Sequence, residues 1–161
     1  MAKQQKTKIF ISYKTGAKDG LTKDANQIRR FLEDQKYDVW MDSEKLIGSK
    51  EWNEEIYNAI PKSDIVLLLL AQKTGFSEWV QREITVARVT RVTVIPVMIR
   101  DDFDADMPPH KVLDEKFDLP RIQYERVING TDDEFARLQA VIEQVKHQTR
   151  RQQEEWITEL T

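Results

Sequence analysis

The stretch Asp64–Val89 decides how the chain folds, because it joins the apolar run IVLLLL (Ile65–Leu70) through a short polar loop to SEWVQREI at residues 77–84. The six apolar residues show no alternation. That pattern is typical of a strand buried on both faces, and such strands occupy the middle of parallel sheets. The segment after it predicts a helix, because Ser77 suits the N-cap and Glu78 places negative charge in the first turn.

One acidic residue of that helix, Glu83, is out of place. With about 100° of rotation per residue, the helix has an apolar face and a polar face. The apolar face contains Trp79, Val80, Ile84, Val86 and Ala87, and the polar face contains Glu78, Gln81, Arg82, Thr85 and Arg88. Glu83 falls near the middle of the apolar face, where burying a carboxylate costs free energy. Two interpretations stay open, a structural ion pair or a functional carboxylate.

Composition narrows the possible functions. A chain of 161 residues with 40% hydrophobic residues is predicted to form one domain with a sizeable core. It has no cysteine and two histidines, which argues against disulfides, thiol nucleophiles and metal sites built from these residues. The net charge is -3 with both signs interspersed, so we expect no nucleic-acid partner. No signal peptide or membrane-length apolar run is found, so we expect no membrane partner and a cytoplasmic location.

Strands and helices alternate along the rest of the chain. The pattern predicts strands at 8–13, 37–41 and 92–99, a weak strand at 121–124, and helices at 22–36, from Ser49 to a stop at Pro61, and from Thr131. Pro96 indicates a bulge or a position near the sheet edge. Thr131 and Glu134 form a capping box. Residues 101–120 are acidic and contain prolines, which favours a solvated loop over a calcium site, because the EF-hand spacing is missing.

The predicted domain organisation is a flexible leader at 1–7, one domain at 8–149 and a polar C-terminal extension at 150–161. The extension ends in a small apolar patch made of Trp156, Ile157 and Leu160. Such a patch folds back onto the body of a protein more often than it binds a partner.

The alternation predicts an α/β fold, a flavodoxin-like doubly wound sheet of about five parallel strands with helices on both faces. Ligands bind such sheets beyond the carboxyl ends of the strands where the strand order reverses, here between the first and third strands. The polar and aromatic residues expected there are Tyr13, Lys14, Asp42, Ser43, Trp79 and Glu83. The five glycines form neither a GxGxxG motif nor a Walker loop, which excludes the classical dinucleotide and P-loop sites.

Three stretches of the chain resemble, in order, the sequence boxes of the TIR (Toll/interleukin-1 receptor) domain. They are Ile9–Tyr13, Val39–Asp42 with the loop at Gly48, and Ser77–Glu83, and the resemblance covers roughly residues 8 to 145. The closest likeness is to the NAD-cleaving branch of bacteria, plant immune receptors and the animal axon-degeneration protein, whose catalytic glutamate lies in a Trp-x-x-x-Glu helix. Trp79 and Glu83 occupy those positions. Lys14 stands where many relatives have arginine, and Val80 where many have cysteine.

The resemblance implies an NAD+ nucleosidase or ADP-ribosyl cyclase, with NAD+ as substrate, no separate cofactor and no metal. Glu83 would be the catalytic residue. The resemblance also implies substrate contacts, some of which have a structural alternative. Trp79 would wall the site or belong to the core, Lys14 would meet the pyrophosphate or lie at the surface, and Asp42 and Ser43 would contact the substrate or close a turn. Trp52 would lie near the adenine, and Tyr13 would line the floor.

The family also implies a setting. Bacterial anti-phage defence is the expected role, with NAD+ bound between two protomers of a homo-oligomer and with a separate sensor or effector protein as a possible partner. Two other functions stay open: a non-catalytic adaptor that assembles through the loop around Ile47 and Gly48, and a secreted mimic of host TIR signalling.

Overall fold

A computed structural model describes residues 6–13, 21–41, 54–71, 78–100 and 125–160, and for 21–22, 54–57, 78–81, 125 and 147–160 it describes the backbone alone. Strands and helices alternate as predicted. The elements are β1 (Lys8–Ser12), α1 (Leu21–Asp34), β2 (Asp38–Met41), α2 (Glu54–Lys62), β3 (Ile65–Leu70), α3 (Glu78–Val89), β4 (Thr93–Met98), β5 (Glu125–Arg126) and α5 (Asp132–Leu160).

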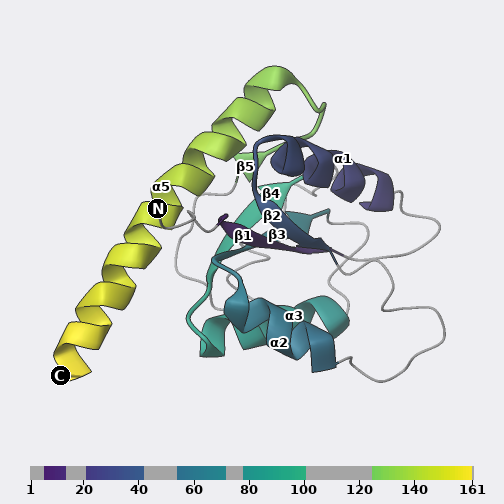
Figure 1. Cartoon of the computed structure of the whole chain (residues 1–161). Helices are drawn as coiled ribbons and strands as arrows, with labels where there is room; N and C mark the ends of the chain where they lie inside the picture. The colour runs from purple at the N-terminus through teal and green to yellow at the C-terminus, as the bar shows by residue number, and fades with distance from the viewer. Residues whose placement is uncertain (1–5, 14–20, 42–53, 72–77, 101–124, 161) are drawn as a thin grey trace, which may run out of the picture.

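The strands form one parallel sheet in the order β2-β1-β3-β4-β5, which is the flavodoxin-like order (Figure 1). The predicted fold class is confirmed. β3 lies at the centre, and all six of its residues are buried. An unbroken apolar strand suits this place because helices cover both of its faces, and each fully buried leucine contributes about 2 kcal/mol.

Two helical layers cover the sheet, with α1 and α5 on one face and α2 and α3 on the other (Figure 1). The α1/α5 cluster includes Ile11, Leu67, Leu32 and Leu138, and Phe31 of α1 stacks on Phe135 of α5 with ring centroids 4.6 Å apart. The α2/α3 cluster is formed by Phe10, Val66, Leu68, Leu70, Val94, Ile60, Ile84, Ala87 and Val92. Alternate residues of β1 and β3 thus enter opposite clusters, as the period of two in a strand requires.

Two helices end in the same hydrogen-bonded turn. After α1, the Lys36 amide donates to Glu33 and the Tyr37 amide to Leu32, and after α3 the Arg91 and Val92 amides make the equivalent bonds. This Schellman pattern needs a left-handed residue, and Lys36 and Arg91 have φ of 71° and 64°. Both turns reverse the chain tightly and send it into the next strand.

The predicted capping box at the start of α5 is confirmed. The Glu134 amide donates to the Thr131 hydroxyl (3.3 Å), and the Glu134 carboxylate accepts from the Thr131 amide (3.1 Å). The same carboxylate also accepts the amides of Ile128 and Asn129, each at 3.0 Å. Desolvation by itself would raise the pKa of Glu134, but these amides and the Thr131 hydroxyl lower it below its ordinary value. One side chain therefore organises the whole entry to α5.

The predicted helix stop at Pro61 is wrong. α2 continues through Pro61 and ends at Lys62, where the Ser63 amide turns back to the Ile60 carbonyl at 3.0 Å. Proline removes a donor and strains the preceding turn, but the helix tolerates it one residue from its end. The predicted start of this helix at Ser49 lies outside the described residues.

Pro96 makes no bulge in β4, because its pairing with β3 runs without a break from Thr93 to Met98. The Ile99 amide donates to Leu70 of β3, whereas the Met98 carbonyl accepts from Val127 on the β5 side. Pro96 has the same parity as Met98, so its missing N–H falls on the β5 side, the edge of the described sheet. The alternative of a tolerant position near the edge is confirmed.

Three other predicted boundaries differ from those in the structure: the bounds of the fifth strand, of the leader and of the C-terminal extension. The fifth strand is seen at Glu125–Arg126, directly after the predicted 121–124, which lies outside the described residues together with the acidic loop 101–120. Thr7, assigned to the leader, is buried, and its carbonyl accepts the Asp38 amide at 2.9 Å. Residues 150–160 continue α5 as a helix, although the side chains of the apolar patch at its end are not described.

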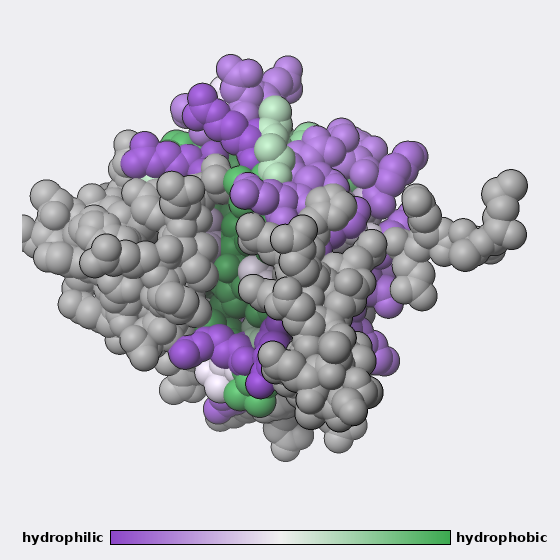
Figure 2. Space-filling model, turned by 90° about the vertical axis from the view of Figure 1, so that its left-hand side faces the viewer, coloured by the Kyte–Doolittle hydropathy of each residue, from purple (hydrophilic) through white to green (hydrophobic). Residues whose placement is uncertain are grey.

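The surface shown in Figure 2 has hydrophilic side chains above and below a narrow hydrophobic strip. None of the helices in the described ranges is both long enough and apolar enough to cross a membrane.

Candidate functional site

Glu83 lies on the buried face of α3, as the helical pattern predicts. Its side chain is 0% exposed, as are those of Ile84 and Ala87, whereas Arg82 and Arg88 point to solvent. Glu83 is the one buried acidic residue among those that the structure describes. Removing water from a carboxylate costs several kcal/mol in real proteins, so a charge at this place requires compensation from its surroundings or from a bound ligand.

The helix that carries Glu83 is held against the centre of the sheet. α3 packs on α2, on β1 and on β4, and Ile84 and Ala87 belong to the α2/α3 cluster. This packing fixes the helix axis and therefore the height of Glu83 above the strands. A group held on a rigid helix keeps its position better than one on a loop, which is what a catalytic carboxylate needs.

The strand order reverses between β1 and β3, directly beneath this layer. The chain passes from β1 outward to β2 and then returns to β3 on the other side of β1. Ser12 ends β1, pairs with Leu68 of β3 and is followed by Tyr13, while Ala71 follows β3. The carboxyl ends of these two strands are the place where ligands bind in sheets of this kind, so Glu83 lies in the layer that borders this crevice.

The structure adds Ser12 to the residues of this site. Its side chain is 0% exposed, and within the described part of the chain its Oγ has no hydrogen-bond partner. Strand alternation places Ser12 on the same face as Phe10, which belongs to the α2/α3 cluster, so it shares a layer with Glu83. The sequence shows a hydroxyl at the end of an apolar strand, which could have pointed to Ser12. It could not show that the hydroxyl has no partner among the described residues.

Only some of the predicted site residues lie in the part of the chain that the structure describes. The ring of Tyr13 is 1% exposed and packs in the α1/α5 cluster, so it lies in the layer opposite to Glu83. Trp79 lies one turn before Glu83 in α3, on the same side of the helix, but its side chain is not described. Lys14, Asp42, Ser43, Trp52 and the cap residue Ser77 lie outside the described residues.

The fold and the site define a class of protein, a doubly wound parallel α/β domain with a buried glutamate on the helix after its central strand. A family described as "TIR domain" matches residues 9–142. The chain belongs to the TIR-domain family.

Two solved structures are similar to the chain. The TIR domains in "Structure of the activated Roq1 resistosome directly recognizing the pathogen effector XopQ" align with a TM-score of 0.50 and 19% identity, over 63% of this chain and 61% of that one. The chain thus matches less than two thirds of that structure's length. A "conserved protein from Enterococcus faecalis V583" aligns with a TM-score of 0.50 and 19% identity, over 89% of this chain and 99% of that one. At this identity the likeness concerns the fold. No curated protein matches the chain.

Proposed function

We propose that this TIR domain cleaves the bond between nicotinamide and ribose in NAD+, with Glu83 as the catalytic carboxylate. The observation that carries the proposal is the complete burial of Glu83 on α3, the helix that follows the central strand and packs on β1 and β4. Trp79, four residues earlier, completes the Trp-x-x-x-Glu spacing that the NAD-cleaving relatives share.

A single carboxylate suffices for this chemistry. Nicotinamide is a pyridinium in NAD+ and departs as a neutral molecule, so no general acid has to protonate it, in contrast to the two-carboxylate glycosidases. The reaction needs stabilisation of positive charge on the ribose as the bond breaks. Water attacking C1 then gives ADP-ribose, and a nitrogen or hydroxyl of the same molecule gives a cyclic isomer.

Burial strengthens the effect of the carboxylate. The field of a charge is screened far less in a protein interior than in water, and a carboxylate already in place needs no reorganisation when the ribose cation forms. The apolar neighbours Ile84 and Ala87 keep water from this side of α3. The cost of burying Glu83 would thus be offset in the transition state.

The test is to incubate purified protein with NAD+ and to separate the products by chromatography with mass detection. We expect nicotinamide together with ADP-ribose or a cyclic isomer. Glu83→Gln, which keeps the shape and removes the charge, should lower the rate by at least about 100-fold. Glu33→Gln is the matched control, because it makes the same change at an exposed carboxylate of α1. Equal NAD+ loss in the wild type and Glu83→Gln would end the proposal.

The alternative function is a non-catalytic adaptor that works by TIR–TIR assembly. It draws support from the Roq1 structure, whose title describes TIR domains within an activated resistosome. In that case assembly and signalling should persist in Glu83→Ala and be lost when Ile47 and Gly48 are changed. We favour the enzyme, in bacterial anti-phage defence as a source of signal or of NAD+ depletion, because Glu83 combines complete burial with the Trp-x-x-x-Glu spacing.

A further inference from the structure

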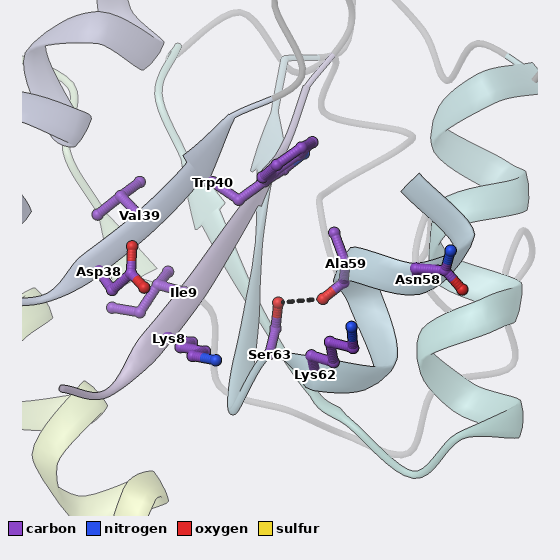
Figure 3. A pocket seen from close by; sticks show the side chains of 9 residues that line it. All are labelled: Lys8, Ile9, Asp38, Val39, Trp40, Asn58, Ala59, Lys62 and Ser63. Carbon is purple, nitrogen blue, oxygen red and sulfur yellow. Dashed lines mark hydrogen bonds between the residues drawn. The ribbon is translucent and has the colours of Figure 1, made fainter. Parts of the chain in front are cut away.

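A groove of about 450 Å³ lies between the edge strand β2 and α2, on the α2/α3 face of the sheet (Figure 3). It is lined by Lys8, Ile9, Asp38, Val39, Trp40, Asn58, Ala59, Lys62 and Ser63. Its volume falls in the range of about 300–1,000 Å³ that holds small molecules. The groove opens at the amino ends of β1 and β2, whereas the candidate NAD+ site lies at the carboxyl ends. The two are therefore separate.

Trp40 forms one end of the groove, and its large ring is 40% exposed. Val39 and Met41 pack against the α1/α5 cluster, so alternation along β2 turns Trp40 to the opposite face. Within the described part of the chain, α2 and α3 pack on β1 and leave this end of β2 uncovered. An exposed indole beside a cavity offers a flat apolar surface on which another aromatic ring can stack.

Two lysines, Lys8 and Lys62, lie at the other end of the groove on either side of Ser63 (Figure 3). Neither ammonium forms an ion pair with a carboxylate of the described residues. The lining itself carries two lysines and one aspartate, Asp38, and the nearby Asp64 carboxylate accepts the Lys8 amide. Two ammonium groups that lie at one end of a groove can together bind an anion.

The walls at the lysine end are rigid. The Lys8 amide donates to the Asp64 carboxylate and the Asp64 amide donates to the Lys8 carbonyl, both at 2.8 Å. The Ser63 hydroxyl donates to the Ala59 carbonyl at 2.8 Å. Lys8 pairs with Asp38, two residues before Trp40, so the backbone positions of Lys8 and Trp40 are roughly 7 Å apart along the strand direction. A side chain as long as lysine spans that gap.

We propose that this groove binds a small anion with an aromatic ring, of the nucleotide class, with its base stacked on Trp40 and its phosphate held by Lys8 and Lys62. The ring and the charge of a nucleotide lie on opposite sides of its ribose, and the groove likewise has the indole at one end and the lysines at the other (Figure 3). The site is independent of Glu83, so NAD+ cleavage and occupancy of this groove can be present or absent separately.

The probe is ADP, added to the ¹⁵N-labelled full chain and followed by NMR at the indole Nε1–H of Trp40. Loss of one of the four indole signals in Trp40→Phe assigns that resonance. We expect a saturable shift of this signal with a midpoint of about 1 mM or below. Adenosine, which lacks the phosphates, should bind at least about tenfold more weakly, and added salt should weaken ADP.

The double variant Lys8→Met, Lys62→Met should weaken ADP by at least about tenfold. Lys23→Met on α1, exposed and remote from the groove, is the matched control and should bind as the wild type does. No saturable shift of the Trp40 signal, or equal binding of ADP and adenosine, would overturn the proposal. If the double variant lost its folded spectrum, the comparison of ADP with adenosine on the wild type would still decide.

Discussion

At the scale of single residues, two buried polar groups mark the candidate site, and they differ in how far the sequence revealed them. The position of Glu83 follows from helical periodicity, because a pattern of 3.6 residues assigns each residue to a face. The alternation of side chains along a β-strand predicts equally well which face of the sheet Ser12 lies on. That its hydroxyl has no partner within the described part of the chain depends on which atoms surround it, and the helices over its face, α2 and α3, come much later in the sequence.

Ser12→Ala is expected to raise stability and lower activity. A buried hydroxyl with no partner costs about 1–3 kcal/mol, so its removal should raise the free energy of unfolding by roughly 1 kcal/mol and the melting temperature by about 2–4 °C. NAD+ cleavage should fall, because a group kept at such a cost at the end of β1 is placed to contact the substrate or Glu83. Calorimetry and the NAD+ assay measure the two effects. A loss of stability would show that the hydroxyl serves the fold instead.

At the scale of elements, most helices and strands lie where the pattern predicts them, and the errors concern their ends. The capping box of α5 was predictable because its two side chains are three residues apart and close a local ring of hydrogen bonds. The predicted stop at Pro61 was wrong because proline is most disruptive in the interior of a helix, where it removes a hydrogen bond and strains the preceding turn. Pro61 lies in the last turn of α2, and the helix ends one residue later. Lys36 and Arg91 adopt the left-handed conformation that glycine usually provides at the end of a helix. The sequence has no glycine at these places, so these two turns could not be predicted from it.

Glu134 should give stability a dependence on pH. Its pKa in the folded protein is below the value of about 4.3 in the unfolded chain, so its contribution is complete above that value and is lost as the pH falls through the folded pKa. Glu134→Ala should cost about 1–2 kcal/mol at neutral pH, because it removes the hydrogen bonds that the carboxylate accepts. Denaturant unfolding between neutral pH and about pH 3 should show this difference constant above about pH 5 and shrinking below it. A difference that stays flat through acid would mean that the charge does not hold the cap.

At the scale of the whole molecule, the sheet divides the protein into two ends with different chemistry. The carboxyl ends of β1 and β3 border the layer of Glu83 and Ser12, and the amino ends of β1 and β2 open into the groove of Trp40 and the two lysines. Neither grouping is local in the sequence, because each combines residues from a strand and from a later helix.

Assembly is the remaining property at this scale. The family resemblance implies that NAD+ is bound between two protomers, so we expect specific activity to rise with protein concentration and with crowding agents. The rate should depend on concentration more steeply than in first order over the range where oligomers form, as measured by light scattering on the same samples. Specific activity that stays constant on dilution of a monomeric sample would show that one protomer holds a complete site.

The sequence by itself determined the order of strands and helices, the parallel sheet with a buried β3, and the face of α3 that carries Glu83. All of these follow from periodicity and from end signals between residues close together in the chain. The tertiary structure alone decided that the Ser12 hydroxyl has no partner among the described residues, that the ring of Tyr13 packs in the α1/α5 cluster, and that Trp40 borders a groove with Lys8 and Lys62. These depend on how the helices pack on the sheet, and no short-range pattern encodes contacts between residues that are far apart in the chain.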